Sequence, residues 1–438
     1  MQMEPIQVAI VGMGTVGTGV ARVLTGSPER ITSRAGRPVQ LKRAIVRELG
    51  KDRGLALPAG VLSTDLQSVI DDPEIQIAVH LVGGIEPARQ ILIDLLRAGK
   101  DVVTANKALL CEHGAELFGL AHELGRTIAF EAAVAGGIPI IATMSTCLTA
   151  NQVQSISAIL NGTSNFILSQ MVRENWSYDQ ALRKAQELGY AEADPTLDVD
   201  GTDAAQKLVL LTQLAYGVRV PLEAFPRQGI DRLELADIKY ASELGYTVKL
   251  LATARLVSGQ LEMHVRPTLV RNDSPLASIH GSFNAIRVVG DVVGETWYSG
   301  RGAGQMPTAS AVLADLIDTI VGRTKLTFAR LEPWRDTAHF TLQPRERNEA
   351  RNYLRFQVAD RPGVLAEITA ILGRNNISIA SVIQHEAPDL GPNGGINPFV
   401  PLVIMTHRTT DGQWMSAERE LSRLTAVRPD HVRMSVLD

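Results

Sequence analysis

The side chains best suited to acid–base chemistry gather in one acidic loop. Five carboxylates fall within the twelve residues 192–203, a density that can tune and position a neighbouring acid or base. Pro195 and Gly201 keep this stretch from joining the helix that should follow it. Asp200 or Thr202 is then the natural cap of that helix.

The helix expected over 202–216 carries an acid and a base on one face. Asp203 and Lys207 are four residues apart, so they lie one above the other. The simplest interpretation is an exposed ion pair worth a few tenths of a kcal/mol. The apolar continuation LVLLTQLAY indicates instead that this face is partly buried, and a lysine flanked there by carboxylates can act as a general acid. The sequence leaves both interpretations open.

A glycine-rich turn near the N-terminus has the spacing of a dinucleotide-binding fingerprint. Gly12, Gly14 and Gly17 follow the strand-like run 7–11 and open a helical pattern over 16–24. The first glycine permits a tight turn, the second lets the backbone approach a pyrophosphate, and the third permits close helix packing. The helix N-terminus supplies an anion site. The context favours cofactor binding over an ordinary glycine turn.

The end of the next strand bears on the choice of cofactor. No carboxylate stands near Arg47, where NAD-specific folds hold the ribose hydroxyls, and this guanidinium can instead meet a 2′-phosphate. NADP is therefore favoured, NAD remains possible, and the alternative role for Arg47 is that of a solvated surface arginine.

A third candidate, Thr104-Ala105-Asn106-Lys107, ends another strand and leads into a helix. Open α/β sheets bind ligands at this carboxyl edge, so Lys107 is aimed at the cofactor cleft. From position alone a surface lysine is equally compatible with the pattern.

The order of elements predicts an α/β fold in several parts. Over 7–149, strand-like runs alternate with helical segments, which indicates a parallel sheet covered by helices. An α+β domain follows, and the end of the chain reads as one βαββαβ module. Helices are expected at 87–98, 108–124, 164–173, 178–188, 233–244 and 308–321, and strands of the second part at 247–257, 261–270 and 284–293. The expected domains are 1–150, completed by 302–323, then 151–323, a linker over 324–350, and 351–438.

Composition excludes several classes of protein. The 438 residues carry 43 Lys and Arg against 47 Asp and Glu, a net charge of −4 that speaks against binding to nucleic acid or an anionic membrane. The two cysteines, the absence of a long apolar run and the lack of a leader pattern predict a cytoplasmic protein. The nine histidines contain no pair at metal-ligand spacing, so a metalloenzyme is not expected.

Several motifs together resemble homoserine dehydrogenase. They are the glycine fingerprint, ANK, LNGTSN, GYAEADPTLDVDGTDAAQK and SGRGAGQMPTASAV, and DRPGVLAEITAILGRNNISIASVIQ near the C-terminus resembles an ACT regulatory domain. The resemblance implies a Rossmann-like NAD(P)-binding domain, an α+β catalytic and dimerisation domain, and a C-terminal ACT domain. It also implies reversible, NAD(P)H-dependent reduction of L-aspartate 4-semialdehyde to L-homoserine, on the route to threonine and methionine.

The resemblance assigns roles to the residues of the acidic loop. Lys207 matches the family's proton donor, Lys107 a second lysine near the reacting carbonyl, and Asp203 a carboxylate bonded near the lysine. Glu192 matches the carboxylate that holds the substrate ammonium, and Asp198 a further substrate contact. These residue types suit the reaction, because hydride delivery leaves an alkoxide that needs cationic donors and a proton.

The resemblance also implies cofactor and cation contacts. The residues expected at the cofactor are Gly12, Gly14, Thr15, Val16, Gly17, Arg47, Thr104, Lys107, Gly162 and Gly304. The segment FEAAVAGGIP is similar to the family's loop for sodium or another monovalent cation, bound mainly through backbone oxygens of Glu131, Val134, Gly136 and Ile138. A Gly-Pro turn before a helix is the alternative.

For the last module the resemblance implies a paired ACT domain that binds an amino acid. Asp360 is the candidate N-cap of its first helix, and Gly363 allows close approach of a ligand or chain. Threonine is the expected effector, and a homodimer or homotetramer the expected assembly. The segment 387–399 is longer and richer in Pro and Gly than expected for this domain.

Two competing functions remain for comparison. An aspartate-semialdehyde dehydrogenase needs a nucleophilic cysteine, and neither Cys111 nor Cys147 has an adjacent histidine. A non-catalytic sensor of nucleotide and amino acid has no use for Glu192, Asp203 and Lys207 together. No kinase segment precedes residue 1, which predicts a monofunctional enzyme.

Overall fold

The structure, a computed structural model, describes residues 4–333, 335, 340–385 and 399–437. The chain forms two compact units that are interleaved along the sequence. Unit 1 comprises 1–156, 205–224 and 283–340, and unit 2 comprises 157–204, 225–282 and 341–438. Each unit therefore takes in three separate stretches of chain.

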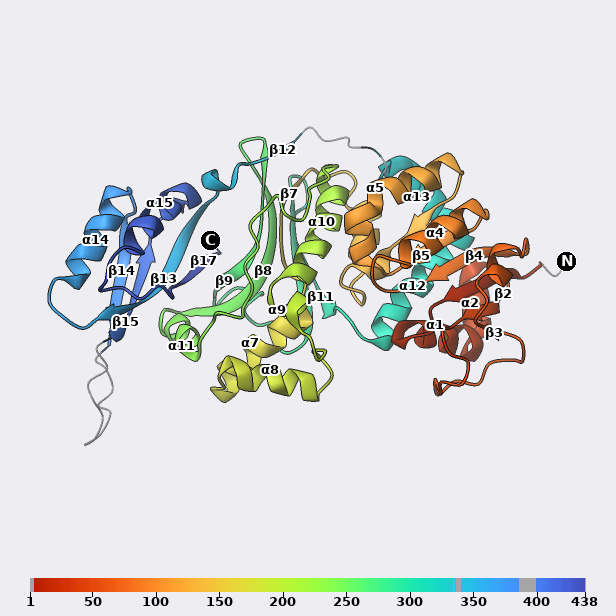
Figure 1. Cartoon of the computed structure of the whole chain (residues 1–438). Helices are drawn as coiled ribbons and strands as arrows, with labels where there is room; N and C mark the ends of the chain where they lie inside the picture. The colour runs from red at the N-terminus through yellow and green to blue at the C-terminus, as the bar shows by residue number, and fades with distance from the viewer. Residues whose placement is uncertain (1–3, 334, 336–339, 386–398, 438) are drawn as a thin grey trace. The chain divides into compact units, whose positions relative to one another are not determined.

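Short runs rich in Val and Ile form the parallel sheet of unit 1 (Figure 1). The strand order β3-β2-β1-β4-β5-β6 is that of a Rossmann fold, which confirms the α/β prediction. The strands are β1 (Ile6–Val11), β2 (Val39–Ile45), β3 (Leu62–Ser63), β4 (Ile75–His80), β5 (Asp101–Thr104) and β6 (Ile128–Ala129). The two-residue β3 is too short to leave a pattern in the sequence.

Helices cover both faces of this sheet. Ala309, Val312 and Leu316, from a helix far along the chain, share a buried core with Val8 and Ile10 of β1. The helices on that face are α1 (Thr15–Gly26), α2 (Pro28–Ala35) and α12 (Gln305–Ile320), and those that pack together elsewhere on the sheet are α4 (Ala88–Arg97) and α5 (Lys107–Glu123). Residues near the N-terminus and residues of α12 therefore form one common core.

The rest of unit 1 differs from expectation in two places. The strand expected over 284–293 ends at Gly290 as β10 (Phe283–Gly290), and a turn leads into an antiparallel partner, β11 (Gly294–Arg301). Helix α13 (Arg323–Leu331) occupies the first part of the expected linker. Unit 1 also contains α3 (Gln67–Ile70), η1 (Glu131–Ala133), α6 (Ile140–Ala142) and the π-helix η2 (Thr143–Cys147).

Unit 2 combines helices with an extended sheet. Its strands follow the order β7-β8-β9-β17-β13-β15-β14. The first part consists of β7 (Val153–Ile159), which begins in unit 1, α7 (Gly162–Glu174), α8 (Tyr178–Glu187), α9 (Thr196–Val199), α11 (Leu235–Glu243), β8 (Tyr246–Val257) and β9 (Gln260–Arg271). Helix α10 (Thr202–Tyr216) starts in unit 2 and ends in unit 1, with the bounds that the sequence predicted.

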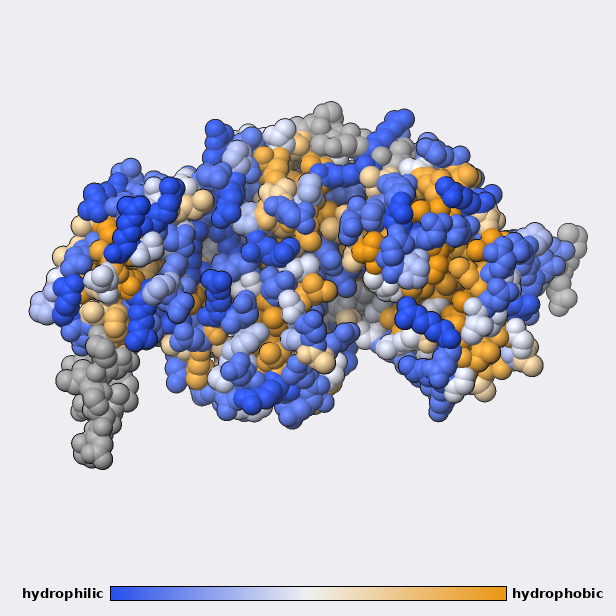
Figure 2. Space-filling view, in the orientation of Figure 1, coloured by the Kyte–Doolittle hydropathy of each residue, from blue (hydrophilic) through white to orange (hydrophobic). Residues whose placement is uncertain are grey.

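The C-terminal module has the predicted βαββαβ order. Helices α14 and α15 pack on its sheet through a core that includes Phe356, Ile368 and Trp414, and the face that they present is mostly hydrophilic (Figure 2). The module contains β13 (Glu349–Ala359), α14 (Val364–Arg374), β14 (Ile379–Gln384), β15 (Phe399–Thr406), β16 (Thr409–Thr410), α15 (Asp411–Leu421) and β17 (Val432–Val436), preceded by β12 (Thr341–Leu342) and η3 (Arg345–Arg347). Nearly all of segment 387–399, noted for its length, falls outside the described residues.

Among the helices that the structure describes, none combines the length and the apolar character needed to cross a membrane.

Candidate active site

The glycine turn after β1 is built as a dinucleotide site requires. Gly12 has φ +102°, and a Cβ there would lie 2.6 Å from the Leu81 carbonyl oxygen. A Cβ on Gly17 would lie 2.1 Å from the Gly12 carbonyl oxygen, so the helix can start this close to the strand only with glycine. A Cβ on Gly14, in contrast, would meet no protein atom within 4 Å.

The start of α1 is open to an anion. Gly14 is its N-cap, without a side-chain cap, and its first turn contains no acidic residue. Gly14 and Thr15 are exposed and Val16 is half-buried. The N–H groups of this turn can therefore bind a pyrophosphate, so the residues present fit a dinucleotide cofactor.

The carboxyl ends of β4 and β5 meet beside this turn. Thr104 is fully buried, and its hydroxyl lies 3.2 Å from His80 Nδ1. Desolvation lowers the pKa of the buried His80 imidazole to about 4, so the ring is neutral. Asn106 caps α5 by accepting from Leu109 N–H and donates to the Val82 and Gly84 carbonyls. This places the half-buried Lys107 as the first residue of α5.

Arg47 lies in the loop that follows β2 and is exposed. That position leaves its guanidinium accessible to a ligand.

The acidic loop is organised by an asparagine that sequence reasoning passed over. The side-chain oxygen Oδ1 of Asn161 accepts from the Ser164 N–H at the start of α7, and this bond fixes the orientation of the side-chain amide. Its Nδ2 therefore points at two carboxylates and donates to Asp198 at 2.8 Å and to Asp203 at 2.9 Å. The LNGTSN motif contains this asparagine, but a role was predicted only for the glycine that follows it, Gly162, the first residue of α7.

Burial decides between the two interpretations of the Asp203–Lys207 face. Asp203 is 8% exposed and Lys207 is 9% exposed, so an exposed surface pair is wrong. Asp200 lies two residues before the first residue of α10 and accepts from the Thr202 N–H and hydroxyl, so it satisfies that backbone group without being the N-cap itself. Two features of the loop differ from expectation: it contains the short helix α9, which carries the half-buried Asp198, and Glu192 is exposed.

The expected cation loop is tightly folded. The Glu131 carboxylate accepts from the N–H groups of Ile141 and Ala142. Desolvation nevertheless raises the pKa of Glu131 to about 7, against the lowering effect of these backbone bonds. The carbonyls of Glu131 and Ile138 each accept one backbone bond, and a carbonyl oxygen has a second lone pair to offer. Val134 and Gly136 are also buried, so all four residues face a protein interior.

The remaining glycines sit where a helix begins. Gly304, with φ +122°, is the N-cap of α12, and Pro307 lies in its first turn as predicted. Gly363, with φ +92°, is the N-cap of α14, which has no side-chain cap. The expectation that Asp360 caps this helix is therefore wrong, because the helix starts three residues later than an Asp360 cap requires.

The cysteines do not suit nucleophilic catalysis. Burial raises the pKa of the Cys111 thiol to about 12, so it is not a thiolate at neutral pH. Cys147 is exposed at the end of η2.

Three family models match the chain. They are described as "Homoserine dehydrogenase, NAD binding domain" over residues 12–131, "Homoserine dehydrogenase" over 139–317, and "ACT domain" over 352–404. A homoserine dehydrogenase of Pseudomonas aeruginosa is 40% identical over 446 aligned residues, which cover 99% of this chain and 99% of that protein.

Solved structures resemble the whole chain. The crystal structure of a homoserine dehydrogenase from Thiobacillus denitrificans superposes with a TM-score of 0.91 at 42% identity, and the match covers 100% of this chain and 99% of that one. A hyperthermophilic archaeal homoserine dehydrogenase in complex with NADPH matches with a TM-score of 0.61 at 28% identity, over 72% of this chain and 97% of that chain.

Proposed function

This chain belongs to the homoserine dehydrogenase family and is an oxidoreductase acting on a CH–OH group, and from that premise we propose how its residues share the work. The reaction interconverts L-homoserine and L-aspartate 4-semialdehyde. The full-length matches support this function over the aspartate-semialdehyde dehydrogenase and sensor alternatives.

Lys207 acts as the proton donor. In the direction of aldehyde reduction its Nζ gives a proton to the oxygen that becomes the alkoxide, and in the reverse direction it accepts that proton. The observation that carries this role is the burial of Lys207 one helical turn after Asp203, a carboxylate that Asn161 holds in place. Lys107, at the start of α5, stabilises the developing negative charge.

Glu192 and Asp198 bind the substrate ammonium. Asp198 is already oriented by Asn161, whereas Glu192 is exposed and makes its contact when substrate is present. Two carboxylates can replace the water that an ammonium loses on binding.

The cofactor is NADP, bound by the N-terminus of α1 and the residues expected from the fingerprint. The nicotinamide supplies the hydride when bound. Exposed Arg47 binds the 2′-phosphate, and the NADPH complex of the archaeal relative supports this choice over NAD. The loop of Glu131, Val134, Gly136 and Ile138 binds a sodium ion or another monovalent cation through backbone oxygens.

The ACT domain makes the enzyme responsive to threonine. Its helix α14 begins at an exposed glycine without a side-chain cap, which leaves backbone N–H groups for a ligand carboxylate. Two such domains pair, giving a homodimer or homotetramer. Exposed residues of β14, the last strand in the sheet order, suit such pairing. The predicted location is the cytoplasm.

The central test is replacement of the proton donor. Lys207→Ala should reduce kcat for homoserine oxidation by ~10²-fold or more and leave NADP affinity nearly unchanged, since general acid catalysis contributes about 10²–10⁴. The matched control is Lys184→Ala, because Lys184 pairs with Glu187 on the surface of α8. Turnover of Lys207→Ala close to that of the control would contradict the assignment.

Cofactor choice is tested in the same assay. Arg47→Ala should weaken NADP more than NAD, and Arg34→Ala, an exposed arginine in α2, should affect neither. Equal loss of both cofactors would remove Arg47 from the phosphate site.

A further inference from the structure

Unit 1 contains a cavity that the reaction does not use. Its volume is about 260 Å³, just below the range of about 300–1,000 Å³ typical of sites for drug-sized molecules. Its lining comes from α5, β6, η1, α6, η2, the C-terminal half of α10, α12 and α13. It includes none of Lys107, Lys207 or the glycine turn. A molecule the size of an amino acid fits this volume.

One wall of the cavity carries two neighbouring carboxyl groups. Glu131 and Asp315 both line it, and the Glu131 N–H donates to an Asp315 carboxylate oxygen at 2.7 Å. Among the residues that the structure describes, no arginine or lysine forms an ion pair with either group. Asp315 is half-buried and lines the cavity, and burial together with the neighbouring Glu131 raises its pKa well above the ordinary value. A ligand cation placed against these two carboxyl groups would stabilise their ionised form.

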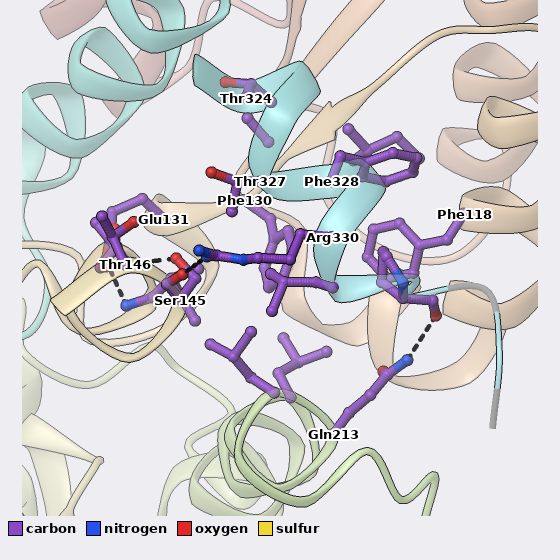
Figure 3. A pocket seen from close by; sticks show the side chains of 18 of the residues that line it. Phe118, Phe130, Glu131, Ser145, Thr146, Gln213, Thr324, Thr327, Phe328 and Arg330 are labelled. Atoms are coloured by element: carbon purple, nitrogen blue, oxygen red, sulfur yellow. Dashed lines mark hydrogen bonds between the residues drawn. The ribbon is translucent and has the colours of Figure 1, made fainter. Parts of the chain in front are cut away.

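A guanidinium crosses the cavity near the same wall. Arg330 of α13 donates to the Ser145 carbonyl in the π-helix η2 (Figure 3). Single π-helical turns occur often at functional sites. Arg330 is exposed and uses one donor in this bond, so its other donors can bind a ligand carboxylate.

The opposite side of the cavity is apolar. In Figure 3 Glu131 and the Arg330 guanidinium lie toward one end, and Phe118 and Phe328 lie toward the other. The two aromatic rings are 6.0 Å apart between centroids, and Leu210 and Leu214 of α10 add to the lining. Opposite charges at one end and an apolar pocket at the other match the head and the side chain of an apolar amino acid.

We propose that this cavity is a binding site for a zwitterionic amino acid with an apolar side chain. The ammonium lies against Asp315 and Glu131, the carboxylate takes donors of Arg330, and the side chain packs against Phe118 and Phe328. The site is separate from the substrate and threonine sites proposed above, so its test is independent of theirs. It shares only Glu131 with the proposed cation loop, and it uses the carboxyl group of that residue rather than the backbone oxygen.

The test is calorimetric titration of the full chain with L-leucine and two analogues. 4-Methylpentanoate lacks the ammonium and 3-methylbutylamine lacks the carboxylate, and each should bind at least ~10-fold more weakly than leucine because one charged contact is lost. Equal binding of either analogue, or no heat from leucine up to about 10 mM, would overturn the proposal.

Variants locate the binding within the molecule. Asp315→Asn and Arg330→Gln should each weaken leucine at least ~10-fold, whereas Lys325→Gln, an exposed residue of the same helix α13, should not. Arg330→Gln keeps the test decisive if Asp315→Asn fails to fold, because Arg330 is exposed. Saturating threonine and the variant Glu192→Gln should leave leucine affinity unchanged. Leucine binding that either of them abolishes would assign it to another site and overturn the proposal.

Discussion

Two strand-to-helix turns of this chain look alike in sequence but require glycine for different reasons. The turn before α1 and the turn before α14 both expose a helix N-terminus without a side-chain cap, and both have a glycine as N-cap. In the first, added Cβ atoms at Gly12 and Gly17 would collide with backbone oxygens. In the second, a Cβ on Gly363 would meet nothing within 4 Å, and only its φ of +92° favours glycine.

The difference separates two uses of the same residue. At the first turn glycine allows the backbone to pack closely and leaves room at Gly14 for a cofactor. At the second turn the protein itself requires glycine only for its backbone conformation, so a substitution there should cost far less stability. Substitutions at the two turns should therefore differ in their effects on stability and on cofactor binding.

Gly17→Ala should break the first turn. Its Cβ would lie 2.1 Å from the Gly12 carbonyl oxygen, and relief requires a shift of the backbone. We expect a loss of about 3 kcal/mol in the free energy of unfolding, measured with urea, and loss of NADP binding. Gly26→Ala at the end of the same helix, with no atom within 4 Å, is the control and should cost nothing.

Acid should lower the free energy of unfolding through His80, which directly precedes Leu81, the residue in contact with Gly12 of the first turn. The folded-state pKa of His80 is about 4, below its ordinary value of 6.5. Between pH 4 and pH 6.5 the unfolded chain therefore binds more protons at this residue than the folded chain does. Stability contributed by His80 is present above pH 6.5 and falls as pH drops toward 4, by about 3 kcal/mol at most. His80→Gln should flatten the pH dependence of urea unfolding relative to His113→Gln, a half-buried histidine of α5.

The pH dependence of urea unfolding must be compared between the wild type and His80→Gln, because other histidines contribute to it. Buried His264 in unit 2 has a pKa lowered to about 4 as well, chiefly by desolvation, and adds its own slope to the whole chain. A His80→Gln profile parallel to that of the wild type would show that the imidazole beneath the turn does not titrate in this range.

Gly14→Ala should separate binding from stability. The added methyl meets no protein atom but occupies the space that the pyrophosphate approaches. The Kd for NADP should rise by ~10-fold or more, about 1.4 kcal/mol, with an unchanged urea midpoint. An unchanged Kd would mean that the cofactor does not approach this turn.

Gly363→Ala should have the smallest effect. Strain at a positive φ costs about 1 kcal/mol, with no collision to add to it. Basal turnover should stay at the wild-type value, and inhibition by threonine should weaken if the ligand approaches this turn. A loss of stability as large as that of Gly17→Ala would remove the contrast between the two turns.

Local signals were enough to predict the elements that position the site. The glycine fingerprint, the alternation of strands and helices, and the bounds of α10 all follow from spacing and hydrophobic period within one stretch of chain. The burial of Lys207 was indicated by the apolar continuation of its own helix.

Features that depend on distant partners were missed. The bonds from Asn161 to Asp198 and Asp203 span 37 and 42 residues, and no local period encodes them. Strand β11 has no fully buried residue, because its positions are half-buried or exposed, and it lacks the apolar pattern of a core strand. Asp360 has the composition of a cap, but the positive φ of Gly363 sets the start of the helix.

Because β17 lies between β9 and β13, the strands of this sheet cannot pair in the order in which they are synthesised. This last strand lies between β9 and β13, pairing Ser435 with Thr268 and Val436 with Leu269 on one side. A chain growing on the ribosome therefore holds β9 and β13 long before the strand that joins them exists. Until residues 432–436 emerge, both strands present open edges to other nascent chains. The segment that forms β17 thus decides whether the sheet closes within its own molecule or pairs with that of a neighbouring molecule.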